Sequence, residues 1–169
     1  RTLGQSAMTN FTTLGATHAA CFASCERRHV VVQHEAVFEF TRQGVDALGI
    51  ALGQIAKSII FRRKSDDSAV LVITSGDRRV DEKKVDALVG KTGRADADFV
   101  RARTGFAIGG VSPLGHLQPP VTLIDRDLFR FEEIWAAAGH PNGVFRLRPQ
   151  DLPGLTSGAP VADVAQVPA

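Results

Sequence analysis

Two apolar runs separated by a short polar break constrain the fold of this chain more than any other feature. Residues 58–62 read Ser-Ile-Ile-Phe-Arg, and residues 69–74 read Ala-Val-Leu-Val-Ile-Thr. Their β-branched and aromatic side chains favour extended structure. The residues between them, Lys-Ser-Asp-Asp-Ser at 64–68, are typical of a turn. The pattern therefore predicts an antiparallel hairpin.

Helical and extended patterns are interspersed along the rest of the chain. The spacing of apolar residues predicts helices over residues 18–28, 44–52, 81–89, 97–104 and 130–138, and a last helical turn from Pro149. Apolar runs predict strands over residues 30–32, 36–40, 106–108, 121–124 and 144–147. Asp81 is placed to cap one helix and Gly105 to end another. Because the clearest strand pair is a hairpin, we expect an α+β fold with a mixed, mostly antiparallel sheet and surrounding helices.

Length and composition bound the class of protein. A chain of 169 residues suits one domain, and we expect residues 15–169 to form it and residues 1–14 to be poorly structured. The sequence contains no run of eighteen apolar residues, so we expect no membrane span and a cytoplasmic protein. The net charge of +2 is too small for a protein that coats duplex nucleic acid, but it allows a site for one or two phosphates.

The two cysteines of the chain, Cys21 and Cys25, lie four residues apart with His18 and His29 nearby. They could form a metal site or a redox pair, or they could be two small residues one turn apart on a helix that faces the core. The spacing does not match a zinc-binding pattern, which needs two further ligands. We therefore expect structural thiols, no metal and no cofactor.

A glycine-rich segment at 109–115 reads Gly-Gly-Val-Ser-Pro-Leu-Gly. Gly109 and Gly110 allow the backbone to approach a ligand closely, and Pro113 stiffens the segment. Such a loop either presents backbone N–H groups to a carbonyl oxygen or merely reverses the chain. It matches neither a Walker loop nor a dinucleotide-binding fingerprint.

Four further side chains have both a functional and a structural interpretation. Lys57 precedes the first strand of the hairpin and either holds a phosphate in a cleft or is a solvated strand end. Ser58 is expected on the opposite side of the strand. His116 follows the glycine-rich segment, and His140 lies between a predicted helix and a predicted strand. Each histidine either lines a site or belongs to a turn.

The usual hydrolase motifs are absent from the sequence. It has no Gly-x-Ser-x-Gly elbow and no His-Glu-x-x-His zinc motif. Ser112 has no catalytic partner that the sequence identifies. A hydrolase with this sequence is therefore expected to work without a strong protein nucleophile.

The order of these features resembles that of the YbaK/prolyl-tRNA-synthetase-associated (ProX-like) family of aminoacyl-tRNA deacylases. The matching stretches are GQIAKSIIF at 53–61, SGDRRVD at 75–81, TGFAIGGVSPLG at 104–115, WAAAGHPN at 135–142 and VADV at 161–164. The resemblance implies a mixed sheet with a pocket for the aminoacylated end of tRNA. The sequence departs from the family pattern at residues 41–45, Thr-Arg-Gln-Gly-Val.

The resemblance also implies roles for individual residues. Lys57 is expected to position the substrate through its terminal phosphate or its aminoacyl group. The amides of Gly109 and Gly110 are expected to hold the ester carbonyl, while water attacks with help from a ribose hydroxyl of the substrate. The remaining residues expected to contact substrate are Ser58, Val111, Ser112, Pro113, His116 and His140.

The function implied by the resemblance is that of a freestanding trans-editing hydrolase for mischarged aminoacyl-tRNA. The expected substrate is tRNA for proline that carries a small wrong amino acid, bound by its acceptor end, and prolyl-tRNA synthetase is a candidate partner. The alternative is a module that binds a tRNA end or a nucleotide without catalysis.

Overall fold

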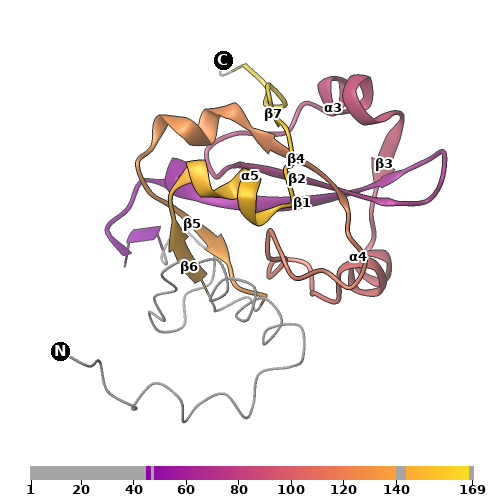
Figure 1. Ribbon diagram of the computed structural model, residues 1–169, viewed down its shortest axis with the longest axis horizontal. Helices are drawn as coiled ribbons and strands as arrows, with labels where there is room; N and C mark the ends of the chain where they lie inside the picture. The colour runs from indigo at the N-terminus through magenta and orange to yellow at the C-terminus, as the bar shows by residue number, and fades with distance from the viewer. Residues whose placement is uncertain (1–44, 47, 140–143, 168–169) are drawn as a thin grey trace, which may run out of the picture.

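A computed structural model of the chain describes residues 45–46, 48–139 and 144–167, which form a seven-stranded sheet with helices on both of its faces (Figure 1). The strands are β1 (Ile55–Arg63), β2 (Ala69–Ser75), β3 (Thr92–Arg94), β4 (Val121–Asp125), β5 (Ile134–Ala137), β6 (Val144–Leu147) and β7 (Val161–Ala162). The helices are α3 (Glu82–Val89), α4 (Ala97–Thr104) and α5 (Leu152–Leu155), with 3-10 turns η3 (Leu52–Gln54), η4 (Arg126–Arg130) and η5 (Pro149–Asp151).

The predicted hairpin forms the centre of the sheet. β1 pairs antiparallel with β2 from Ala56↔Ser75 to Arg62↔Ala69, and every residue of β2 is buried. The strands follow the order β6-β5-β1-β2-β4-β7, and β3 also pairs with β1. Three strand pairs are antiparallel and three are parallel, with most paired residues in the antiparallel ones. The predicted α+β fold with a mixed, mostly antiparallel sheet is confirmed.

The helices predicted over 81–89 and 97–104 form, and the predicted capping residues Asp81 and Gly105 lie at their ends. The Asp81 side chain accepts hydrogen bonds from the N–H groups of Lys83 and Lys84 at 3.0 and 3.4 Å, which caps α3. Gly105 ends α4 with a φ of +81°, a backbone conformation that glycine adopts readily. The predicted strands at 121–124 and 144–147 and the helical turn at Pro149 are also confirmed.

Two predicted elements are wrong, and a third is shorter than predicted. Residues 130–138 do not form a helix: Arg130 ends η4, and Ile134–Ala137 form β5, whose four residues are all buried between β1 and β6. Residues 106–108 do not form a strand, because the chain turns at once between residues 107 and 110. The helix predicted over 44–52 ends early, since Gly49 adopts a φ of +65°.

Several predictions lie outside the described residues. They are the helix over 18–28, the strands over 30–32 and 36–40, the two cysteines, and the poorly structured segment at 1–14. The expected domain boundary therefore stays a prediction.

The two faces of the hairpin are covered by different elements. Ala56 and Ile60 of β1 belong to a core cluster with Val100 of α4 and Leu152 of α5. Phe61, on the opposite face, belongs to a second cluster that includes residues of α3 and of the C-terminal segment. Figure 1 shows α3 and α4 on opposite sides of the sheet. Because side chains alternate along a strand, consecutive residues of β1 point into different surroundings.

Candidate active site

A gap in strand pairing lies along one edge of β1. On this edge β5 pairs with residues 55–56, and β3 pairs with residues 61–63. Among the described residues, no strand pairs with residues 57–60 on this side. A cavity of about 430 Å³ lies at the gap. Its lining residues are Ala56, Lys57, Ser58, Ile59, Ile60, Arg94, Ala95, Val100, Ile108, Gly109, Val111 and Ala137.

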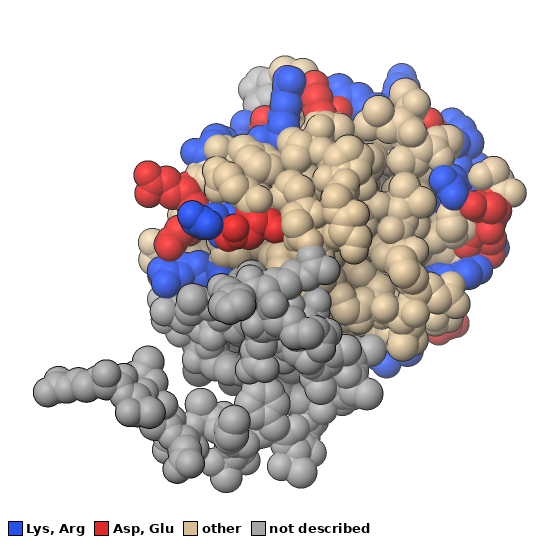
Figure 2. Space-filling view, viewed as in Figure 1, with Lys and Arg blue, Asp and Glu red and all other residues tan. Residues whose placement is uncertain are grey.

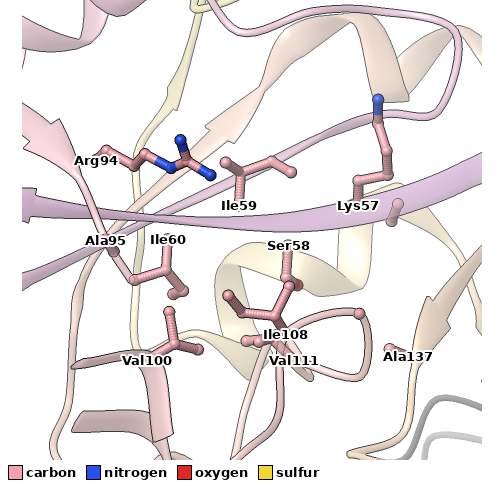
Figure 3. A pocket seen from close by; sticks show the side chains of 12 residues that line it. Lys57, Ser58, Ile59, Ile60, Arg94, Ala95, Val100, Ile108, Val111 and Ala137 are labelled. Atoms are coloured by element: carbon pink, nitrogen blue, oxygen red, sulfur yellow. The ribbon is translucent and has the colours of Figure 1, made fainter. Parts of the chain in front are cut away.

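The cavity has a cationic side and an apolar side, separated by β1. Figure 3 shows the side chains of Lys57 and Arg94 above the strand, with the apolar side chain of Ile59 between them. The side chains of Ser58, Ile60, Val100, Ile108 and Val111 lie below it. The gap therefore connects two chemically different halves of one site, and a ligand that passes through it would meet both.

Lys57 is half-buried and its ammonium group is held in place. Nζ donates a hydrogen bond to the backbone carbonyl of Arg78 at 2.9 Å. Burial lowers the pKa of Lys57, the charge of Asp77 opposes this, and the charge of Arg79 adds to it. The side chain is therefore not a freely solvated strand end, and an anion bound beside it would restore the preference for the charged form.

Ion pairs fix the turn that supplies the acceptor for Lys57. One nitrogen of Arg130 donates to both carboxylate oxygens of Asp77 at 2.6 Å, and Arg78 Nε donates to Asp127 at 2.7 Å. A Cβ atom at Gly53 would lie 2.5 Å from Arg130 Nη2, so the close approach of this arginine requires glycine there. No local pattern in the sequence predicted this network, although Gly53, Asp77 and Arg78 lie within the family-like stretches.

The glycine-rich segment contributes Gly109 and Val111 to the cavity. The N–H of Gly110 donates to the carbonyl of Ala107 at 3.0 Å and closes a four-residue turn. Gly109, the third residue of this turn, has a φ of +91°, a sign that favours glycine. The amide of Gly110 is thus used inside the loop, whereas Gly109 and Val111 border the cavity.

The residues that follow lie behind this loop. Ser112 is fully buried, and its Oγ accepts a hydrogen bond from the N–H of Leu114 at 3.3 Å. Pro113 and His116 line a different cavity, of about 470 Å³, between this segment and residues 155–160. The structure therefore does not bring Ser112, Pro113 or His116 into the cavity at β1.

His116 helps to hold the loop. Its Nε2 lies 2.8 Å from the carbonyl oxygen of Ser112, and its ring meets that of Phe106 edge-on at 5.6 Å between centroids. The contact with the carbonyl assigns the proton to Nε2. Burial lowers the pKa of His116 to about 4, although the carbonyl of Ser112 favours the charged ring. The ring is therefore neutral at neutral pH.

Ser58 has an unusual environment for a hydroxyl group. Its Oγ is buried and has no hydrogen-bond partner among the described residues. Figure 3 shows this side chain pointing from β1 toward Ile108 and Val111. Among the described side chains on the apolar side of the cavity, only that of Ser58 is polar.

The remaining predictions concern other sites. His140 lies outside the described residues. Within the part of the chain that the structure describes, no three His, Cys, Asp or Glu side chains are grouped so that they could hold a metal ion. None of the helices described there is long and apolar enough to cross a membrane.

Charged side chains are mixed over the face of the molecule shown in Figure 2. Lys and Arg alternate with Asp and Glu around its rim, and the middle of the face is uncharged. This face has no broad patch of one sign. A nucleic acid bound there would depend on a few local cations, as the net charge of +2 also indicates.

Comparison with protein families identifies one match over most of the chain. A family model described as an aminoacyl-tRNA editing domain matches residues 34–155. The uncharacterized protein YwhH of Bacillus subtilis (strain 168) is 32% identical over 132 residues, which cover 78% of this chain and 83% of that protein. A proline–tRNA ligase of Desulfotalea psychrophila is 29% identical over 126 residues, which cover 72% of this chain and 21% of the ligase.

Solved structures share the fold. A crystal structure described as that of "a putative trans-editing enzyme for prolyl tRNA synthetase" is similar with a TM-score of 0.81 and 37% sequence identity. The similarity covers 92% of this chain and 100% of that chain. The hypothetical protein APE2540 is similar with a TM-score of 0.78 and 25% identity over 87% of this chain and 99% of that chain.

The unpartnered hydroxyl of Ser58 leads to a prediction about stability. Replacing Ser58 with Ala removes a buried polar group that has no hydrogen-bond partner in the described part of the chain, so we expect the free energy of unfolding to stay unchanged or to rise by up to about 1 kcal/mol. Ser75→Ala is the matched control, because the Ser75 hydroxyl is buried and bonded to the carbonyl of Gly53 and to Asp77. That control is expected to lose about 1–3 kcal/mol in urea unfolding. An equal loss for Ser58→Ala would show that its hydroxyl is bonded.

The burial of His116 predicts a pH dependence of stability. The folded-state pKa of about 4 lies below the ordinary value of 6.5, so between these values the unfolded chain binds a proton that the folded chain does not. Stability is therefore lost as the pH falls from 6.5 toward 4. Partial exposure of the ring reduces the effect to about 2 kcal/mol. His116→Gln keeps a donor toward Ser112, and we expect its free energy of unfolding to fall by about 2 kcal/mol less than that of the wild type between pH 7.5 and 4.5. The same decrease in both proteins would contradict the prediction.

Proposed function

Because the chain belongs to the aminoacyl-tRNA editing domain family, we propose that it is a freestanding hydrolase that removes the wrong amino acid from mischarged tRNA. The substrate in this proposal is tRNA for proline carrying a small wrong residue. The observation that carries the proposal is the cavity at the gap in β1, with cations on one side and apolar side chains on the other. The end of an aminoacylated tRNA has the matching parts, which are a phosphate and an acyl group joined through a ribose.

The two sides of the cavity give the substrate an orientation. Lys57 and Arg94 are the cationic side chains of the lining, so we assign the terminal phosphate to their side. Arg94 is exposed and forms no ion pair among the described residues, which leaves its guanidinium group available. The acyl group then lies below β1 against Ile60 and Val111. The cavity, of about 430 Å³, has room for a ribose together with an acyl group.

The glycine-rich segment beside the cavity is proposed to stabilise the reacting ester. We assign the ester carbonyl to the amides of Gly109 and Val111, while the hydrogen bond from Gly110 to Ala107 keeps the loop rigid. Donors fixed in this way stabilise the negative charge that develops on the carbonyl oxygen as water attacks. The oxygen of the water forms a bond with the acyl carbon, the ester bond breaks, and the ribose oxygen takes up a proton. The family resemblance assigns assistance in this step to the neighbouring ribose hydroxyl.

This mechanism needs no protein nucleophile. The polar side chains of the lining are those of Lys57, Ser58 and Arg94, and Ser112 is fully buried outside it. Positioning and carbonyl stabilisation can supply a large share of the acceleration for an ester. The protein is proposed to act in the cytoplasm, with the acceptor end of tRNA and prolyl-tRNA synthetase as partners.

A panel of mischarged tRNAs tests this function, together with Lys57→Ala. We expect hydrolysis of small aminoacyl esters on tRNA for proline, and a loss of about 10–100-fold in kcat/KM when the ammonium group is removed. Lys83→Ala is the control, because Lys83 is an exposed lysine on α3 and does not line the cavity. Both variants are expected to keep the free energy of unfolding within about 1 kcal/mol of the wild type.

Two results would contradict the proposed deacylase activity. Folded protein that hydrolyses none of the esters has no deacylase activity. Tight binding of acceptor-stem RNA without hydrolysis would instead identify a tRNA-end binding module, since the same cavity would then serve recognition alone.

The assignment of a phosphate to Arg94 predicts a salt-dependent effect. Arg94→Ala should raise KM several-fold, with little change in kcat, because the contact is the same in the ground state and the transition state. The slope of the logarithm of the tRNA binding constant against the logarithm of salt concentration should fall by about 0.7–1, the value for one lost phosphate contact. An unchanged slope, as expected for Lys83→Ala, would remove Arg94 from the site.

A further inference from the structure

Two residues of β1, Ser58 and Ile60, direct backbone groups toward its open edge, and Ser58 lies farther from β3. Arg63 donates its N–H toward the β2 side, to Ser68 O at 2.9 Å, and Lys64 donates its N–H toward the β3 side, to Lys91 O at 2.8 Å. Backbone groups of successive residues in a strand point to alternate edges, and the β1–β2 register is continuous from residue 56 to residue 62. The N–H and C=O of Ser58 therefore point away from β2, into the gap.

Ser58 lies within this gap. Two residues before it, Ala56 pairs with β5, and three residues after it, Phe61 pairs with β3. Within the described part of the chain, no strand reaches Ser58 from that side. Its side-chain Oγ, buried on the apolar side of the cavity, has no described partner either. A backbone carbonyl and a hydroxyl of one residue are thus both available where the cavity opens.

We propose that Ser58 binds the α-amino group of the substrate, with its backbone carbonyl and its Oγ as the acceptors. The inference rests on the proposed function and adds a recognition element to it. An aminoacyl group has one set of donors, on its amino nitrogen, while its carbonyl is an acceptor and is assigned to the amides of Gly109 and Val111. Below β1 the described lining side chains other than that of Ser58 are apolar, so none of these side chains offers an alternative acceptor.

The arrangement is a one-residue form of strand addition. Peptides that bind along a sheet edge form main-chain hydrogen bonds with it, and pockets next to the edge select their side chains. Here the edge is interrupted by β5 on one side and β3 on the other, so it has room for one residue. The site thereby recognises a single amino acid through its free amino group, without a carboxylate.

The test compares substrates with and without the amino group. The first is the aminoacyl-tRNA of the panel that the wild type hydrolyses fastest, and the second is the same tRNA acylated with the matching desamino acid. Rates are corrected for spontaneous hydrolysis of each ester. We expect the wild type to prefer the amino ester by about tenfold or more in kcat/KM. Ser58→Ala, which loses one of two acceptors, should reduce this preference about 3–10-fold, and Ser58→Thr, which keeps a hydroxyl, should retain it.

Each outcome separates the recognition of the amino group from the enzyme activity. An equal decrease of kcat/KM for both esters in Ser58→Ala would give the hydroxyl a merely structural role and overturn the inference. Equal hydrolysis of both esters by the wild type would also overturn it, but would leave the deacylase function intact. Folded wild-type protein that hydrolyses no aminoacyl-tRNA would reject the proposed function and the inference together.

Discussion

The candidate site depends on an interruption in the hydrogen bonding of β1. One edge of this strand is paired with β2 along seven residues, whereas the other is paired at its two ends by the short strands β5 and β3. A fully paired strand would bury its backbone groups, and no ligand could reach them. The interruption leaves an opening in the sheet, and the cavity at this opening is lined by residues on both faces. The cavity, its lining of opposite character and the exposed backbone of Ser58 all follow from this one feature.

The alternation of side chains along β1 gives the opening its chemistry. Lys57 leaves the strand on the side of α3 and is held there by the turn after β2, while Ser58 leaves it on the side of α4 and the glycine-rich loop. Lys57 and the glycine-rich loop therefore lie on different sides of β1. In the proposed function they bind groups that are separated along the tRNA end, namely the phosphate and the ester carbonyl. The proposal accordingly gives Lys57 a role in positioning the substrate and none in proton transfer.

The sequence predicted the parts of the fold that local patterns determine. The hairpin, α3 and α4 each have a turn or a cap beside a periodic apolar run, and all three form. β5 was mistaken for a helix because its residues are all buried, so the segment lacks the alternation of polar and apolar residues that marks a strand. Lys57 and Gly109 were candidates from their local sequence, each with a functional and a structural interpretation. The resemblance supplied their expected roles, because local patterns do not show that segments about fifty residues apart line one cavity. The gap had no sequence signal, because it arises from where two other strands end. Arg94 was missed because it lines the cavity only through its place at the end of β3.

Hydrogen exchange of single backbone amides is the most direct test of the gap in β1. The N–H groups of Lys57 and Ile59 face β2 and should exchange slowly, whereas the N–H of Ser58 faces the gap and should exchange quickly in the free protein. Adding a non-hydrolysable analogue, an aminoacyl group joined by an amide bond to the 3′ end of a short acceptor-stem RNA, should slow the exchange of Ser58 and leave that of Ile59 unchanged. Slow exchange of Ser58 in the free protein, or no response to the analogue, would contradict the account.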